Sequence, residues 1–138
     1  MPLQEMFLRH IDSIDGEIEV RAEPGLPFVS CHFGAFSIAV GHDDNRAMVG
    51  LIGQVMADPD RAYPSIEVDV GETVQCGAHI QRDGHGNVTE RLLYLSSGAV
   101  HARLHFSTAS LLVGALCEGY AWHQQQKLAA AGGEVASC

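Results

Sequence analysis

Segments in which apolar and polar residues alternate run through most of this chain, and they constrain its fold more than any other feature. The clearest example is residues 100–106, with the sequence VHARLHF. Successive side chains of a β-strand point to opposite sides, so this spacing predicts a strand with one apolar and one polar side. Short strands of this kind are typical of antiparallel sheets that bury one face and leave the other polar.

The same alternation predicts six further strands besides the one at about 99–107. They comprise residues 17–22, two strands within 28–40 that meet at a turn or bulge near Gly34, and residues 66–70, 73–81 and 88–95. The sequence Asp-Gly-His-Gly-Asn at 83–87 is typical of the turn of a β-hairpin. We therefore expect the strands on either side of it to pair.

Apolar residues that recur every three or four positions predict three amphipathic helices. Their expected ranges are 2–15, 45–57 and 109–128. The sequence Asp43-Asp44-Asn45 suits the N-cap of the second helix, because short polar side chains accept hydrogen bonds from the unpaired N–H groups there. Ser107 or Thr108 suits the same position of the third helix.

The expected order of elements is α-β-β-β-α-β-β-β-β-α, which predicts an α+β fold. We expect a two-layer sandwich in which three helices cover the apolar face of a mostly antiparallel sheet. A chain of 138 residues has the size of one domain and can bury a core without cross-links. Residues 1–127 are expected to form that domain, and the Ala- and Gly-rich residues 128–138 a flexible tail.

Charge and hydropathy argue against several classes of partner. The 8 Lys and Arg residues are scattered and are outnumbered by 17 Asp and Glu, which gives a formal charge of −9. Nucleic acids and anionic membrane surfaces require clustered basic residues, so neither is expected as a partner. No stretch is apolar enough for a transmembrane helix, and residues 1–15 lack the apolar core of a signal peptide. The expectation is a cytoplasmic protein.

Four basic residues fall on the polar side of predicted strands. Together, His79, His101, Arg103 and His105 could bind a carboxylate, a phosphate or an acidic partner, and the imidazoles would make that binding depend on pH. The alternative is a solvated face on which these side chains pair with acidic residues of neighbouring strands. We treat the four as candidate ligand- or partner-binding residues.

Two spacings that would suit a metal ion on a helix do not suit one on a strand. Cys76 and His79 point to opposite sides of their predicted strand, and His101 and His105 are about 13 Å apart along theirs. The ligand atoms of one zinc ion lie within about 2.0–2.3 Å of it. The spacings of the four cysteines match no zinc motif either. The sequence therefore predicts no metal site and no other cofactor.

A further candidate precedes the second predicted helix. His42 and Asp43, in the sequence Gly-His-Asp-Asp-Asn, could act as a general base and an orienting acid. A strand, this sequence, a helix and more strands resemble the order of elements in hot-dog thioesterases and dehydratases, which place a His or an Asp beside a central helix. The resemblance implies an acyl-thioester enzyme that uses these two residues. Ordinary helix capping is the alternative.

The last predicted helix carries Tyr120 and Trp122 near its end. Aromatic residues in such a position often anchor a protein partner or a dimer mate. Ordinary packing into the core is the alternative.

Three hypotheses of function follow. The favoured one is a small acidic adaptor, chaperone or inhibitor that binds protein through its sheet face and last helix, without catalysis, as a homodimer. It explains why no nucleotide-binding or hydrolase motif is present. In size, charge and terminal helix the chain resembles the dimeric chaperones of type III secretion, and in element order the profilin-like roadblock modules. The alternatives are the thioester enzyme, and a small-ligand or pH sensor that uses the four basic residues of the polar face.

Overall fold

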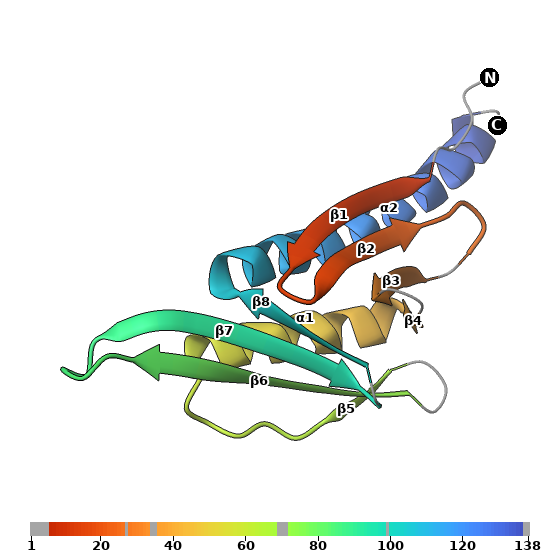
Figure 1. Ribbon diagram of the computed structural model, residues 1–138. Coiled ribbons are helices and arrows are strands. Elements are labelled where there is room, and N and C mark those ends of the chain that lie inside the picture. The colour runs from red at the N-terminus through yellow and green to blue at the C-terminus, as the bar shows by residue number, and fades with distance from the viewer. Residues whose placement is uncertain (1–5, 27, 34–35, 69–71, 99, 137–138) are drawn as a thin grey trace.

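The computed structural model describes residues 6–26, 28–33, 36–68, 72–98 and 100–136. Within these ranges the chain forms eight strands and two helices (Figure 1). In chain order they are β1 (Phe7–Ser13), β2 (Gly16–Ala22), β3 (Val29–Phe33), β4 (Phe36–Val40), α1 (His42–Ala57), β5 (Ile66–Val68), β6 (Glu72–Arg82), β7 (Val88–Ser97), β8 (Val100–His105) and α2 (Phe106–Ala136). Each half of the chain thus has four strands followed by one helix.

Each half forms its own antiparallel sheet, with the strands in the order β1-β2-β3-β4 in the first and β5-β6-β7-β8 in the second. Neighbouring strands in each sheet are also neighbours in the sequence. The α+β class and the antiparallel pairing expected from the sequence are confirmed. The expectation of three helices is wrong, because the described residues contain two.

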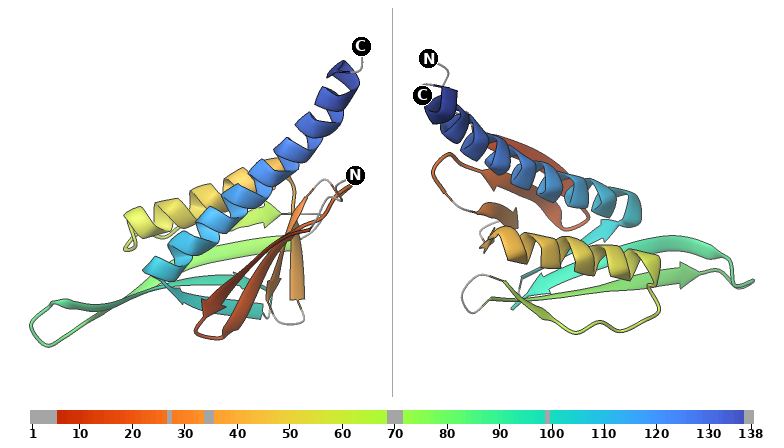
Figure 2. Two further views of the ribbon diagram at one scale, coloured as in Figure 1. Left: turned by 90° about the horizontal axis from the view of Figure 1, so that it is seen from above. Right: turned by 180° about the vertical axis from the view of Figure 1, so that it is seen from behind.

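Both helices lie on the same side of the two sheets (Figures 1 and 2). The first helix, α1, packs against β5 and β6 of the second sheet, whereas α2 packs against β1 and β2 of the first sheet and also contacts β7 and β8. The two helices contact each other as well. Each helix therefore covers the sheet of the other half, and the halves share one core that includes Ile18, Ile52, Leu93 and Leu112.

The N-terminal segment is a strand, not the helix that the sequence predicts over residues 2–15, of which 1–5 lie outside the described ranges. The strand β1 buries Phe7 and Ile11. A spacing of four residues places two side chains on one face of a helix and also on one face of a strand. The apolar pattern therefore fits both structures, and pairing with β2 along the whole of β1 decides for the strand.

A tight turn joins β1 to β2. Ser13 pairs with Gly16, whose φ of 132° is a conformation that favours glycine. The Ser13 hydroxyl donates a hydrogen bond to the carbonyl of Gly16 at 2.5 Å and accepts one from the N–H of Asp15 at 3.2 Å. Gly16, the residue directly after the helix expected over residues 2–15, is thus part of a hairpin turn.

The helix α1 begins at His42, three residues before the start that the sequence predicts. Its N-cap residue Gly41 makes no side-chain capping hydrogen bond, and Asp43 lies within the first turn, so the expected capping by residues 43–45 is wrong. Asn45 is instead buried, and its Nδ2 donates a hydrogen bond to the carbonyl of Leu116 in α2 at 3.1 Å. This side chain joins the two helices.

The helix α2 begins at Phe106, directly after β8, and continues to Ala136. Ser107 and Thr108 lie inside it, so neither is the N-cap that the sequence predicts. The helix also includes residues 128–136 of the segment expected to form a tail, and its last part projects beyond the sheets (Figure 2). Neither helix in the described ranges is long and apolar enough to span a bilayer.

The other strands lie close to their expected positions. The structure has β2, β6, β7 and β8 where alternation predicts them, and β3 pairs with β4 as a hairpin. Residues 34–35, the expected turn of that hairpin, and residues 69–71, at the end of another expected strand, lie outside the described ranges.

Candidate functional site on the second sheet

The side of the second sheet that faces away from the helices is exposed, and we call it the open face. Its described residues are Gln75, Gly77, His79, Glu90, Leu92, Tyr94, Ser96, His101, Arg103 and His105. The four basic residues singled out in the sequence do share this face, and all four are exposed. Their role in binding stays a prediction.

The centre of the open face is apolar. Tyr94 is 43% exposed and lies across Gly77 on the neighbouring strand, so closely that a β-carbon at position 77 would overlap its ring. Leu92, opposite both His79 and His105 in the strand register, is buried at 8% exposed, so Tyr94 provides most of this apolar surface. An apolar centre with a polar rim is the usual composition of a protein-binding surface.

Arg103 already holds a carboxylate of its own chain. Asp15, in the turn between β1 and β2, accepts hydrogen bonds from Nε and Nη2 of Arg103 at 3.1 and 2.8 Å. These hydrogen bonds lower the pKa of the Asp15 carboxyl group and raise the pKa of the Arg103 guanidinium. The imidazoles are therefore the basic groups of the open face that remain available to a partner.

The imidazoles of the open face do not converge on one point. His79 and His105 are separated by a whole strand, and their Cα atoms are therefore about 10 Å apart. Cys76 is buried on the opposite side of the sheet from His79, and this burial raises the pKa of its thiol to about 12. Among the described residues, none of these side chains belongs to a group that could hold a metal ion.

One edge of β6 lacks a neighbouring strand over most of its length. The strand β7 pairs along one edge of β6, but β5 has three residues and pairs only with residues 72–74 on the other. Over residues 75–82 no described strand pairs on that side, and no backbone hydrogen bond from the loop at 58–65 reaches it. We call residues 75–82 the free edge. Such an edge is a template for an added strand.

The far end of the free edge belongs to the β6–β7 hairpin, which projects past both helices (Figure 1). On the helix side of this hairpin, Ala78 and Ile80 are only half-buried. Arg82 and Arg91 form no ion pair with any residue in the described ranges, and Arg82 donates only to the carbonyl of Gly86, at 3.3 Å. The free edge is therefore flanked by apolar side chains and by the unpaired charge of Arg82, and Arg91 lies on β7, on the far side of β6 from this edge.

The aromatic residues of α2 do not form an exposed anchor. Trp122 is half-buried against the core, and its ring meets that of His123 edge-on with centroids 5.4 Å apart. Tyr120 is also half-buried and lines a cavity of about 40 Å³ together with Asn45 and His123. These positions favour core packing over the partner binding that the sequence suggests.

The candidate catalytic pair lies at the start of α1. Asp43 is exposed and forms no hydrogen bond with another residue in the described part of the chain, and the side chain of His42 lies outside that part. The geometry therefore adds no support to the thioester-enzyme hypothesis, which stays a prediction.

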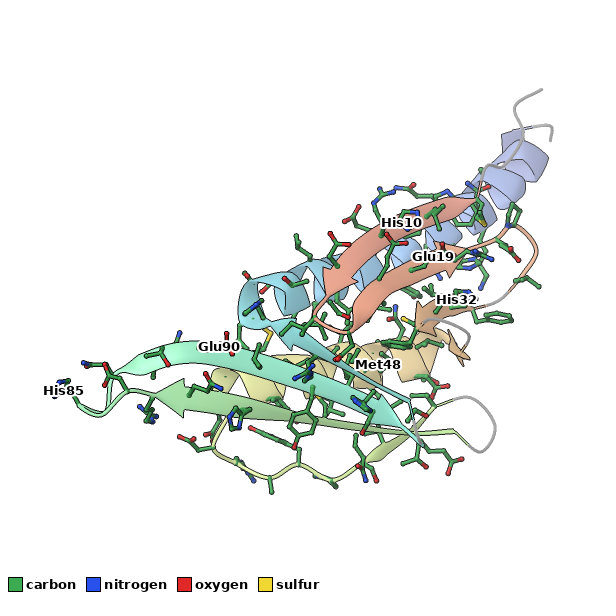
Figure 3. All side chains as sticks on the ribbon, in the orientation of Figure 1. His10, Glu19, His32, Met48, His85 and Glu90 are labelled. Atoms are coloured by element: carbon green, nitrogen blue, oxygen red, sulfur yellow. The ribbon has the colours of Figure 1, made fainter. Side chains whose placement is uncertain are left out.

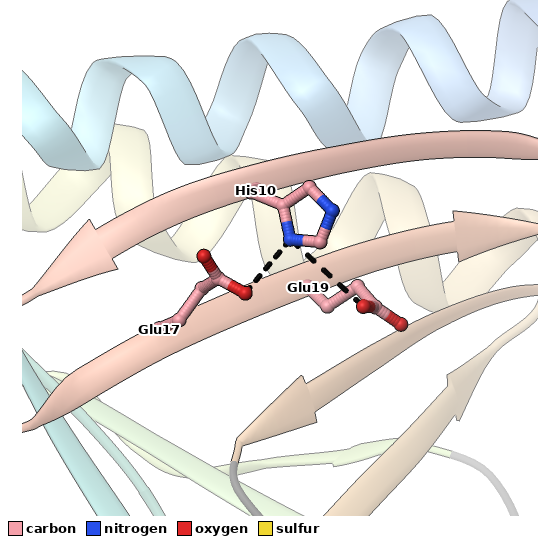
Figure 4. Close-up of side chains that lie close together, drawn as sticks. All are labelled: His10, Glu17 and Glu19. Atoms are coloured by element: carbon pink, nitrogen blue, oxygen red, sulfur yellow. Dashed lines mark hydrogen bonds and ion pairs between the residues drawn. The ribbon is translucent and has the colours of Figure 1, made fainter.

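The first sheet carries a polar group that the sequence analysis misses. His10 on β1 lies beside Glu17 and Glu19 on β2, on the side of the sheet away from the helices (Figures 3 and 4). Its Nδ1 is 2.8 Å from an oxygen of Glu17 and 3.9 Å from one of Glu19. This pairing could not be predicted, because residues 2–15 are expected to form a helix and not a strand beside Glu17 and Glu19. The available signal is the alternation at 17–21, which places Glu17 and Glu19 on one side of a strand.

Comparison with known proteins gives no match, whether against protein-family models, curated proteins or solved structures.

Proposed function

We propose that this protein is a small, non-catalytic binding module that holds an extended, acidic segment of another polypeptide along the free edge of β6. The observation that carries the proposal is the unpaired edge over residues 75–82. A segment added there would gain main-chain hydrogen bonds, which provide affinity with little dependence on sequence. An adaptor, a chaperone or an inhibitor could each work in this way.

The side chains next to the free edge indicate the chemistry of the bound segment. Because side chains of an added strand alternate, every second one would lie on the helix side of the sheet, beside the half-buried Ala78 and Ile80. Apolar residues suit that side. Carboxylates of the segment would pair with Arg82, and Arg91 on β7 adds a second positive charge on the same side of the sheet, one strand further away. Neither arginine forms an ion pair with a carboxylate in the described ranges.

A second copy of the chain suits the free edge less well. Residues 75–82 contain no Asp or Glu, so two free edges paired with each other would leave Arg82 without an opposite charge on the added strand. The homodimer expected from the sequence stays a prediction. Light scattering combined with hydrogen exchange tests it. A dimer in which residues 75–82 are protected from exchange would show that a second copy of the chain, and not an acidic partner, occupies the free edge.

Hydrogen exchange of the unliganded protein tests the edge itself. Amides of β6 that point away from β7 should exchange fast over residues 75–82, while amides of the covered central strands exchange slowly. Slow exchange of every β6 amide in a monomer would show that the backbone N–H groups of the free edge are already hydrogen-bonded, and it would contradict the proposal.

Two synthetic peptides of equal length test the chemistry of the partner. One alternates Val with Glu and the other alternates Val with Lys. The Glu peptide should bind saturably and protect the outward amides of residues 75–82, whereas the Lys peptide should bind at least about tenfold more weakly. Arg82→Glu with Arg91→Glu should reverse this preference, and Arg46→Glu, an exposed change on α1, should not. Equal binding of both peptides, or protection outside β6, would contradict the proposal.

A further inference from the structure

The group formed by His10, Glu17 and Glu19 lies on the outer side of the first sheet (Figure 4). His10 is directly opposite Glu19 in the register of β1 and β2, and Glu17 points to the same side because it is two residues from Glu19. The helix α2 packs on the other side of these strands. Solvent therefore reaches the group, and the side chains of His10, Glu17 and Glu19 are 47%, 53% and 22% exposed.

We propose that these three side chains bind a divalent transition-metal ion, for which zinc is the best match. Their ligand atoms all lie within 4.8 Å of one another. Ligand atoms on a tetrahedral zinc ion with bonds of about 2.0–2.1 Å are about 3.3–3.4 Å apart. This separation lies between the 2.8 Å and 3.9 Å that join His10 Nδ1 to the two carboxylates, so small side-chain rotations would complete the site.

The chemistry of the three donors also suits this ion. One imidazole nitrogen and two carboxylate oxygens are ligands that zinc accepts, and three protein ligands leave its fourth position for water. Magnesium and calcium prefer ligand sets made of oxygen alone, so the imidazole selects against them.

Arg21 orients one of the carboxylates. Its Nη2 donates to Oε1 of Glu19, which leaves Oε2 as the oxygen nearest His10. A hydrogen bond to the non-ligating oxygen is a common way to hold a metal ligand in position. Asp12, opposite Glu17 in the register and exposed, offers one more carboxylate next to the group.

Calorimetric titration of the untagged protein with zinc chloride near neutral pH tests the proposal. The exposed Cys117 and the terminal Cys138 are changed to Ser first, so that thiols do not contribute. One zinc ion should bind per chain. His10→Ala and Glu19→Gln should each weaken binding by at least about tenfold. The control His79→Ala, which removes an exposed imidazole from the other sheet, should leave binding unchanged, and excess Mg²⁺ should not compete.

A second readout separates loss of the site from loss of the fold. Zinc should shift the imidazole NMR signals of His10 and raise the melting temperature of the parent protein, but not that of His10→Ala, whose circular dichroism should match the parent. If zinc does not bind saturably, or binds equally well to His10→Ala, the three side chains form an ion-pair cluster only and the proposal is wrong.

Discussion

Asp15 and Arg103 join the two sheets although they are 88 residues apart in the sequence. The Asp15 carboxylate accepts hydrogen bonds from the backbone N–H of Arg103 at 2.8 Å and from its guanidinium. The N–H of Ile14 donates to the carbonyl of Arg103, also at 2.8 Å. Both backbone groups of Arg103 are therefore satisfied by the turn of the first sheet, which closes part of the outer edge of β8. The free edge of β6 has no such cover among the described residues.

The stability that Asp15 provides should depend on pH in a defined direction. Its pKa is lower in the folded protein than its ordinary value of 3.8, so the ion pair stabilises the fold above that pH and is lost as the pH falls through the folded-state pKa. In urea unfolding, Asp15→Asn should lower the free energy of unfolding at neutral pH, and the difference from the parent should shrink in acid. In an Arg103→Gln background, the loss of stability caused by Asp15→Asn should depend much less on pH. An undiminished pH dependence in that background would show that Arg103 does not cause the lowered pKa of Asp15.

Gly119 lies where α2 packs tightly against the first sheet. A β-carbon there would lie 3.3 Å from side-chain atoms of both Phe7 and Val29. Gly119→Val should therefore lower the free energy of unfolding by about 1–3 kcal/mol through overpacking. In the control Gly114→Val, the added β-carbon would have no neighbour within 4 Å apart from the adjoining backbone of its own helix. This change should be neutral or slightly stabilising, because valine favours a helix more than glycine does. Equal losses in chemical denaturation would show that α2 does not pack as described.

Asn45 should tolerate a neutral replacement better than a charged one. Asn45→Ala removes the hydrogen bond to Leu116 and should cost about 1 kcal/mol of stability. Asn45→Asp has nearly the same shape but places a negative charge where Asn45 is 4% exposed, so it should cost more at neutral pH. Thermal unfolding shows which of the two variants is the less stable. A more stable Asp variant would contradict the buried position of this side chain.

The described cysteines should differ in reactivity. Burial raises the pKa of the Cys31 and Cys76 thiols to about 12, whereas Cys117 is exposed. Under native conditions iodoacetamide should modify Cys117 at least about tenfold faster than Cys31 or Cys76, because the thiolate is the reactive form and must be accessible. Mass spectrometry of the digested protein measures the three rates, and the difference should disappear in urea. Fast native labelling of Cys31 would contradict its position in the core.

Much of the second half of this protein follows from the sequence by itself. The alternation at 100–106 and in the strands before it has a period of two, which a helix cannot match, so it determines both the strands and the side each residue faces. That is why His79 and His105 could be placed on one exposed face before their strands were paired.

The first strand, the free edge and the group around His10 were decided only by the tertiary structure. Phe7 and Ile11 fit a helix and a strand equally well, and hydrogen bonding to β2 resolves the choice. The free edge exists because β5 begins only at Ile66, which is opposite Val74. His10 meets Glu17 and Glu19 only once β1 and β2 pair. The physical reason is the same in each case: local periodicity tells which way a side chain points within its own segment, whereas its neighbours depend on contacts between segments.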